Sequence, residues 1–252
     1  SSATGTIIYV AQDRTDLQFV CRVLASALKR PTERDMRRLK RCVKYFASSA
    51  NVVLLFPWQQ APKDVTVHAD ADWAGDKETR RSTSSGVLFH GKHQLESWSC
   101  GQQVIALSSG ESEFYAVGKG VAHGLYVVQL VKELGQDLKL VVLTDSAAAR
   151  GMMGRIGAGK VRHMQTRYLW AQERLRAWEF VLGKVGTKQN GGGLGSKNVD
   201  RETLERLLPI VGLGASWVRP APAFGGTAKR VTQLAAVLLV NLAAARATTT
   251  TT

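Results

Sequence analysis

Apolar and polar residues alternate along the chain in a way that predicts a mixed α/β domain. Short alternating or β-branched runs, typical of strands, occupy 65–70, 86–91, 94–100, 138–145 and 178–185. Apolar residues at helical spacing predict helices over 110–134, 146–155, 163–177 and 200–211. Three strands in succession indicate an antiparallel meander, with a tight turn at Gly91 and Lys92. A later strand that is reached through a helix should lie parallel to one of them.

The first 60 residues read as a separate helical block. Helical spacing predicts helices over 16–30 and 33–46, separated by Pro31, with Thr32 as the N-cap of the second. That second helix carries a run of basic residues, which form either a solvated face or a face that follows phosphates. A Pro-containing linker over 56–64 ends the block.

The last 40 residues differ from both earlier parts. From residue 213 the chain is rich in Pro and Gly, then in Ala, Val and Leu, and it ends in a run of threonines. We expect a disordered or weakly helical tail without a functional site. The predicted division is therefore 1–60, 61–212 and 213–252.

The net charge of the chain indicates what kind of molecule it binds. Across 252 residues, 34 Lys and Arg stand against 20 Asp and Glu, which gives a net charge of +14 and a pI near 10.0. The excess lies mainly in the first and last blocks, while 61–212 is nearly balanced. Such a chain favours a polyanion, nucleic acid first and a membrane surface second, although a merely basic surface is the alternative.

Cysteine spacing and the chain ends exclude other classes. Cys21, Cys42 and Cys100 are too widely spaced for a zinc ribbon or a disulfide framework, so a reducing compartment is expected. The first residues lack the pattern of a signal peptide and an initiator Met, which suggests a fragment of a longer protein. The apolar stretch 231–245 is too short to span a bilayer.

Three acidic residues are placed where carboxylate chemistry could occur. Asp70 and Asp145 end two predicted strands, and they would share one crevice if those strands are parallel neighbours. Glu113 lies in the first turn of the long helix, in phase with a small-residue face at Ala116, Val117, Gly120 and Gly124. Converging carboxylates repel one another unless a cation lies among them, and Mg²⁺ prefers oxygen ligands. The pattern thus predicts a metal site for phosphoryl transfer, against ordinary roles in a turn or a helix cap.

Four motifs together resemble a known family. HADADWAGDKETRRSTSSG, WSCGQQVIALSSGESEFYA, LTDSAAA and RHMQTRYLW occur in the order found in the ribonuclease H domain of copia-like retrotransposon Pol polyproteins. The block before them is similar to the stretch that joins reverse transcriptase to ribonuclease H in those polyproteins. The resemblance covers about 9–210.

The resemblance implies a fold, an activity and partners. The fold would be ribonuclease H-like, a five-stranded mixed sheet flanked by helices. The activity would be cleavage of the RNA strand of an RNA–DNA hybrid with two Mg²⁺ ions, for which Mn²⁺ could substitute. The partners would be the hybrid and the upstream reverse transcriptase domain, with no membrane. We therefore expect an intracellular protein, cytoplasmic in a virus-like particle or nuclear.

The family motifs assign candidate residues. Asp70, Glu113 and Asp145 match the carboxylates that hold the metal ions and act in catalysis. Glu111 is the weaker candidate because it points to another face of the helix, and Asp72 is expected in a turn or in a supporting position. The dense positive charge over 150–176 and the His of the RHMQ motif predict a further set of contacts to nucleic acid, which comprises Arg150, Arg155, Lys160, Arg162, His163 and Arg167. His163 is either a proton shuttle or phosphate contact, or an ordinary surface residue.

The fourth family carboxylate is missing. In TKQNGGGLGSK (187–197), Thr187, Asn190 and Lys197 fit the family pattern, but Gly193 stands where an Asp is expected. The glycine run also disfavours the helix start that should carry this ligand. Asp200 lies about two helical turns away and could not substitute. Three hypotheses follow: an active hybrid nuclease, a remnant that only binds nucleic acid, or a structural module of a larger Pol chain.

Overall fold

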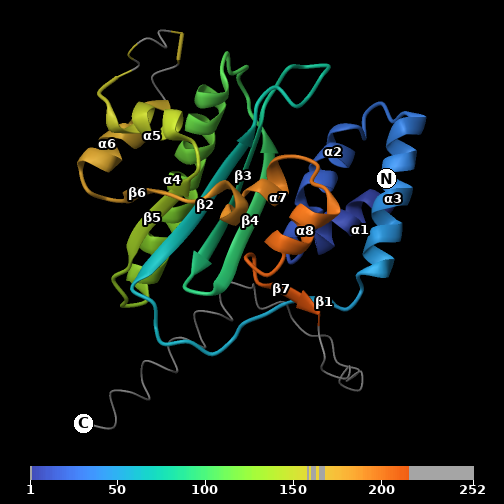
Figure 1. Cartoon of the computed structure of the whole chain (residues 1–252), viewed down its shortest axis with the longest axis horizontal. Coiled ribbons are helices and arrows are strands. Elements are labelled where there is room, and N and C mark those ends of the chain that lie inside the picture. Colours follow the sequence, from blue (N-terminus) through green and yellow to red (C-terminus); the bar gives the residue numbers. More distant parts are fainter. Residues whose placement is uncertain (1, 158, 160–162, 165–167, 216–252) are drawn as a thin grey trace.

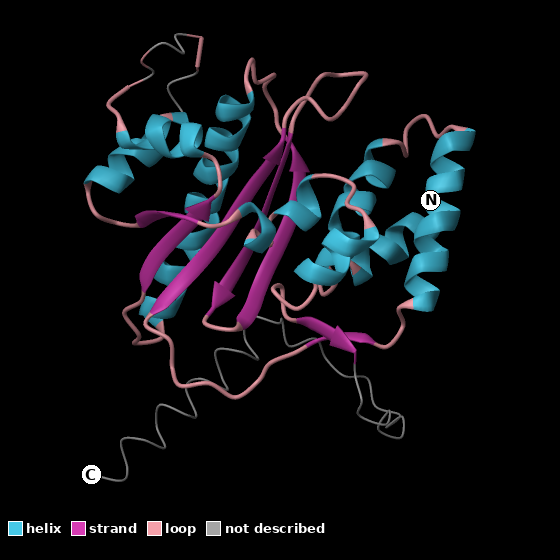
Figure 2. Ribbon diagram, in the orientation of Figure 1, coloured by secondary structure: helices cyan, strands magenta, loops and turns pink. Residues whose placement is uncertain are grey.

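The main sheet of the computed structural model has the predicted mixed arrangement (Figures 1 and 2). The structure describes residues 2–157, 159, 163–164 and 168–215. Five strands pair in the order β4-β3-β2-β5-β6. They are β2 (Asp64–Asp72), β3 (Thr83–His90), β4 (His93–Gly101), β5 (Lys139–Thr144) and β6 (Val181–Lys184).

The strand directions are those that the sequence predicted. β2, β3 and β4 form an antiparallel meander, and β5 pairs parallel with β2, as β6 does with β5. His90 pairs with His93 across the expected two-residue turn, where Gly91 has φ +61°. Glycine adopts this left-handed conformation without steric cost, which explains its place in the turn.

Helix α4 (Ser109–Glu133) packs on the sheet, and glycines on its buried face set the distance between the helix and the sheet. A Cβ added at Gly124 would lie 2.3 Å from Leu140 Cδ1, and one at Gly120 would lie 3.0 Å from Val67 Cγ1. The small-residue face therefore lets the helix backbone approach β2 and β5 closely. Gly135, with φ +84°, follows the helix end as predicted.

The C-terminal helices are shorter than the sequence predicted. They are α5 (Ala147–Gly154), α6 (Trp170–Arg176), the 3₁₀ turn η3 (Thr187–Gln189), α7 (Gly193–Ser196) and α8 (Arg201–Leu207). The prediction of a helix from 163 was wrong at its start, because His163 and Met164 lie in a turn and a bend. The strand predicted from 178 begins only at Val181, because residues 177–180 form a turn and a bend in which Trp178 has φ +58°.

The N-terminal block is helical and docks on the edge strand β4. It contains α1 (Ser2–Val10), η1 (Thr15–Leu17), α2 (Gln18–Ser26) and α3 (Glu33–Ser48). The sequence predicted α2 and α3, including the Thr32 cap, but neither α1 nor η1. Thr15 Oγ1 donates to Gln94 Oε1 at 2.7 Å, and Gln18 Nε2 donates to the Ser97 carbonyl at 3.3 Å. These bonds cover part of an edge that would otherwise be open to pairing.

A second, two-stranded sheet was not predicted. β1 (Val52–Leu54) pairs antiparallel with β7 (Leu213–Ala215), so the segment just before the linker meets the end of the described chain. Residues 213–215 therefore belong to this sheet, and the rest of the predicted tail, 216–252, lies outside the described residues. The division at 60/61 and 212/213 stays a prediction.

Two glycines of α4 should respond to alanine in opposite directions. Gly124→Ala introduces a methyl group into the contact with Leu140, and we expect it to lower the free energy of unfolding by about 1–3 kcal/mol. Gly118→Ala on the same helix meets nothing within 4 Å and should raise it by up to about 1 kcal/mol through helix propensity. Urea denaturation of both variants measures the difference. Equal effects would show that the close approach at Gly124 does not constrain the helix.

Candidate active site

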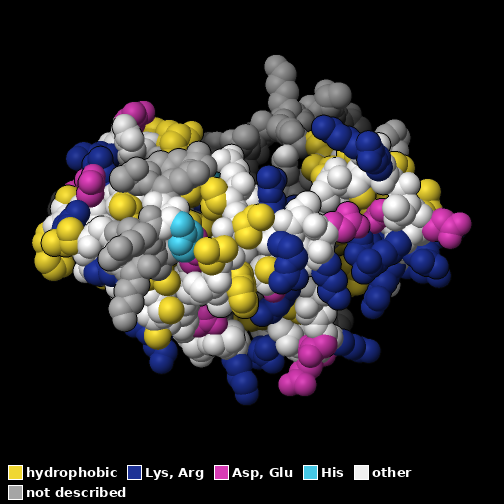
Figure 3. All heavy atoms as spheres, turned by 90° about the horizontal axis from the view of Figure 1, so that it is seen from above, with side chains coloured by type: hydrophobic (Ala, Val, Ile, Leu, Met, Phe, Trp, Pro, Cys, Tyr) yellow, Lys and Arg dark blue, Asp and Glu magenta, His cyan; other side chains and the backbone are white. Residues whose placement is uncertain are grey.

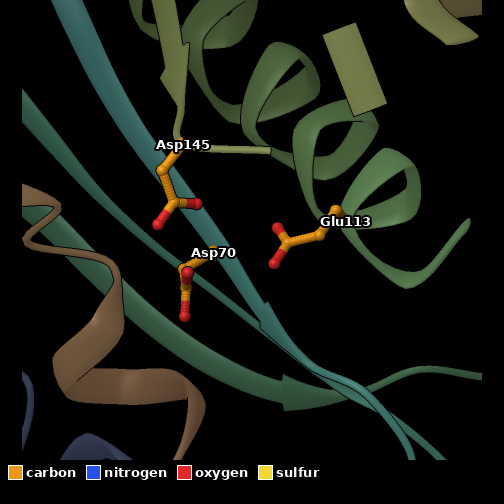
Figure 4. A group of neighbouring side chains, drawn as sticks. All are labelled: Asp70, Glu113 and Asp145. Atoms are coloured by element: carbon orange, nitrogen blue, oxygen red, sulfur yellow. The ribbon is translucent and has the colours of Figure 1, made fainter. Parts of the chain in front are cut away.

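The three predicted carboxylates converge at one edge of the sheet (Figure 4). Asp70 lies in β2, Asp145 directly follows β5, and Glu113 projects from the first turns of α4. One oxygen of each lies within 4.8 Å of the others. Because β2 and β5 are parallel neighbours, their carboxyl ends meet where ligands bind in open α/β sheets.

The ordinary structural roles considered for these residues belong to their neighbours. Ser146, not Asp145, caps α5, since its hydroxyl accepts from the Ala149 amide at 3.1 Å. At the start of α4, Ser108 is the N-cap, and the carboxylate of Glu111 accepts from the Leu107 amide at 2.9 Å. Neither Asp145 nor Glu113 is needed as a cap.

Two of the carboxylates are buried with unsatisfied oxygens. Asp70 is 7% exposed and Glu113 is 8% exposed, and Asp70 Oδ2 and Glu113 Oε2 make no hydrogen bond with the described residues. Burial, with a smaller contribution from the charge of Asp145, raises the pKa of Asp70 to about 6. Burial and then the charges of Asp70 and Asp145 raise the pKa of Glu113 to about 9. Orphaned, mutually repelling oxygens of this kind fit the donor set of a hard divalent cation.

A cavity of about 480 Å³ opens onto the carboxylates. Its lining includes Asp72, Lys197 and the family-matched Thr187 and Asn190. Asn190 Nδ2 donates to the Ala69 carbonyl at 3.1 Å and lies 3.4 Å from Asp70 Oδ1, so it holds the segment 187–197 against β2. The positive charge of Lys197 opposes the rise in the pKa values of Asp70, Asp72 and Glu113.

Gly193 lines this cavity with room for a side chain. It is the first residue of α7, and a Cβ there would meet only Leu207 Cδ1, at 3.9 Å. Gly192 has no such room, because its Cβ would lie 3.0 Å from Asp70 Cβ and from the His68 carbonyl oxygen. A helical turn forms at 193–196 despite the glycine run. The fourth position thus lacks a ligand for want of a side chain, and the space for one is present.

The remaining acidic candidates have other partners. Asp200 is the N-cap of α8 and accepts from the Thr203 amide at 2.8 Å. Glu111 is 1% exposed and accepts from Tyr115 Oη at 2.5 Å and from His163 Nε2 at 2.9 Å. Sequence reasoning missed this network. The i,i+4 spacing of Glu111 and Tyr115 was a usable signal, but nothing in the sequence joined His163 to them.

The predicted contacts to nucleic acid are only partly described. Arg150 lies half-buried on α5, Arg155 follows that helix as its C-cap, and His163 pairs with Glu111. Lys160, Arg162 and Arg167 lie outside the described residues. None of these roles is tested by the geometry, and they stay predictions. Among the described residues, no helix has both the length and the apolar composition to cross a bilayer.

Three relatives are Pol polyproteins of plant retrotransposons. The chain is 25% identical over 215 residues to that of transposon RE1 and 24% identical over 228 residues to that of RE2, both of Arabidopsis thaliana. It is 27% identical over 217 residues to that of transposon TNT 1-94 of Nicotiana tabacum. These alignments cover 83%, 88% and 84% of this chain but only 14%, 15% and 16% of the polyproteins.

A shorter relative covers half of the chain. Secreted RxLR effector protein 161 of Plasmopara viticola is 37% identical over 128 residues, which are 50% of this chain and 89% of that protein. No family model matches.

Two solved structures are similar to the described part. LC11-RNase H1 in complex with an RNA/DNA hybrid is 12% identical, with a TM-score of 0.33, over 50% of this chain and 88% of that one. The N-terminal ribonuclease H domain of a Mycobacterium tuberculosis protein, fused to maltose-binding protein, is 20% identical, with a TM-score of 0.34, over 51% and 92%. The fold assignment rests on the sheet order itself and not on these matches.

The five-stranded mixed sheet and its flanking helices form a ribonuclease H-like fold. The homologues of the chain are copia-like retrotransposon Pol polyproteins, as the four motifs predicted, and the chain spans about a seventh of the length of the polyproteins it matches.

The raised pKa values predict how pH and metal affect stability. Groups whose pKa is higher in the folded state bind protons more tightly there, so their contribution is fully present below the unfolded pKa and is lost as pH rises through the folded value. For Asp70 and Glu113 the window runs from about pH 4 to about pH 9. In EDTA we expect Tm to fall between pH 5 and pH 8, and Mg²⁺ to raise Tm more at pH 8 than at pH 5.

Calorimetric scans with and without Mg²⁺ measure this, and Glu113→Gln is the control. Since the amide cannot ionise, the variant should lose much of the pH-dependent fall in EDTA and much of the Mg²⁺ response. A Tm that rises with pH in EDTA would contradict the electrostatic description of the site.

Proposed function

We propose that this chain is a ribonuclease that hydrolyses the RNA strand of RNA–DNA hybrids. The observation that carries the proposal is the convergence of Asp70, Glu113 and Asp145 within 4.8 Å at the carboxyl edge of a ribonuclease H-like sheet. The similarity to Pol polyproteins and the net charge of +14 support a nucleic-acid substrate. A nuclease is the reaction class that such a carboxylate site supports best.

The three carboxylates would hold two Mg²⁺ ions, or Mn²⁺ in their place. When bound, the metal supplies the means to activate a water molecule and to stabilise the leaving 3′ oxygen. The chain itself fixes the geometry: β2 and β5 hold Asp70 and Asp145 side by side, and α4 holds Glu113 opposite them. Lys197 balances part of the negative charge from the rim of the cavity.

A second candidate function is hybrid binding with weak or no cleavage. Gly193 favours it, because among the described residues three carboxylates converge within 4.8 Å, where the family has four ligands. Fewer anionic ligands bind a metal ion less tightly, so the affected ion would have low occupancy. The docking of the N-terminal block on β4 also fits a structural module that connects to an upstream reverse transcriptase domain. An intracellular location is part of the same proposal.

Asp70→Asn should abolish cleavage and spare binding. Asparagine keeps the shape of the side chain but removes the charge that the metal requires, so we expect a loss of at least about 10²-fold. Asp72→Asn, two residues along the same strand, is the matched control and should lose less. The assay is cleavage of a labelled hybrid in Mg²⁺ and in Mn²⁺, with DNA duplex as the negative substrate. Unchanged cleavage by Asp70→Asn would refute the site.

Gly193→Asp should raise cleavage of the hybrid by about tenfold or more, because it adds a carboxylate to a cavity with space for it. Gly193→Asn has nearly the same shape without the charge and should show no such gain. If both substitutions act alike, the missing charge is not what limits this site. If the wild-type chain is silent and Gly193→Asp is active, the present-day protein is the binding remnant.

A further inference from the structure

Arg22 is a half-buried guanidinium without a counter-ion among the described residues. It projects from α2, and its Nε is buried and donates to no acceptor. Its terminal nitrogens Nη1 and Nη2 make no hydrogen bond or salt bridge with the described residues, and they reach solvent. Burial lowers the pKa of Arg22 below its ordinary value.

Arg14, in the same N-terminal block, has a guanidinium group whose nitrogens all donate hydrogen bonds. Its Nε and Nη2 donate to the two carboxylate oxygens of Asp16 at 2.9 and 2.7 Å, and Nη1 donates to the Ser49 carbonyl at 3.1 Å. Buried charges in proteins are normally paired in this way. The contrast indicates that Arg14 serves the fold, whereas the guanidinium of Arg22 is left available for a ligand.

Strand register places Arg22 on the carboxylate side of the sheet. Asp72 pairs with Thr83, and Thr83 pairs with Gly101, so these three positions form one row across β2, β3 and β4. A Cβ at Gly101 would lie 3.9 Å from Arg22 Nη1, which puts the guanidinium at the β4 end of the row. Two strand spacings and two residues then separate the backbone of Gly101, beside which the guanidinium lies, from that of Asp70, which is about 12 Å.

The side chain is held in position for a planar anion. The Arg22 guanidinium lies over the ring of Phe19, at 5.3 Å from its centroid, which limits its motion and orients its fork. Asp72 and Asp76 are the acidic groups that influence its charge, but neither lies within salt-bridge distance. Lys and Arg side chains gather on the right-hand side of Figure 3, where Figure 1 places the N-terminal helices.

We propose that Arg22 binds a backbone phosphate of the nucleic acid, a few nucleotides from the carboxylate site. This inference rests on the proposed function, and it makes the N-terminal block part of the substrate-binding surface. A guanidinium presents two parallel N–H donors that match the oxygens of a phosphodiester. The solvent-facing nitrogens of Arg22 provide these donors.

The test is binding of a fluorescent RNA–DNA hybrid by the full chain, in an Asp70→Asn background that prevents cleavage. Adding Arg22→Met should raise Kd by about tenfold and reduce the salt dependence of binding by about one unit. Lys132→Met is the charge-matched control, since Lys132 lies in the last turn of α4, about 28 Å along the helix from Glu113. It should change Kd by less than about twofold, because the contact is remote and screened.

The thermal stability of the Arg22 variants distinguishes a binding role of Arg22 from a structural one. Removing an unpaired, partly desolvated charge should leave Tm unchanged or raise it, and Arg22→Lys should restore part of the affinity. Equal Kd values for Arg22→Met and its parent would overturn the inference. It would also be overturned if Arg22→Met had a lower Tm than its parent and the loss of folded protein accounted for the weaker binding. If the Asp70→Asn parent binds no hybrid at all, the proposed function fails and the inference fails with it. If the parent binds and Arg22→Met binds equally well, only the inference fails.

Discussion

The close contact between α4 and the sheet is the constraint on which the site depends. Gly120 and Gly124 allow the helix backbone to approach Val67 and Leu140 at distances that any larger residue would prevent. Well-packed interiors transmit such constraints rigidly, so the contact fixes both the height and the rotation of the helix. Glu113, two turns before Gly120, is thereby held over the ends of β2 and β5. The same packing that builds the core sets the distance between carboxylates on different elements.

Electrostatics works against this packing. Asp70 and Glu113 are buried beside Asp145, and the cavity supplies Lys197 as a nearby positive charge. Their raised pKa values show that the folded chain holds a site whose ionised form it disfavours. Natural proteins tolerate such a conflict at functional sites, where part of the folding free energy is lost to keep the groups that the function needs. Gly193 relieves part of the repulsion, and it also removes one group that could compensate a bound cation.

Periodicity and chain order predicted the five strands of the main sheet and its longest helix. The strand ends at Asp70 and Asp145 and the helical phase of Glu113 also predicted that these three carboxylates lie close together. The pairing of His163 with Glu111 and of β1 with β7 could not be predicted, because each depends on tertiary placement of segments that are short or carry no periodic signal. The start of α6 was missed because the turn at His163 interrupts a segment whose residues favour a helix. The late start of β6 was missed because Trp178, with its positive φ, lies in a turn between the two elements. The roles assigned to individual site residues remain predictions.

The β1–β7 ladder has a consequence for synthesis. Val52 pairs with Ala215, so roughly 160 residues must be made after β1 before its partner exists, and contacts this distant form slowly. At ribosomal rates of about 5–20 residues per second, β1 would wait for about 8–30 s. During that interval its backbone groups are unpaired, and the exposed Leu55 and Phe56 follow directly. The nascent chain therefore carries an unpaired strand edge until β7 has been made.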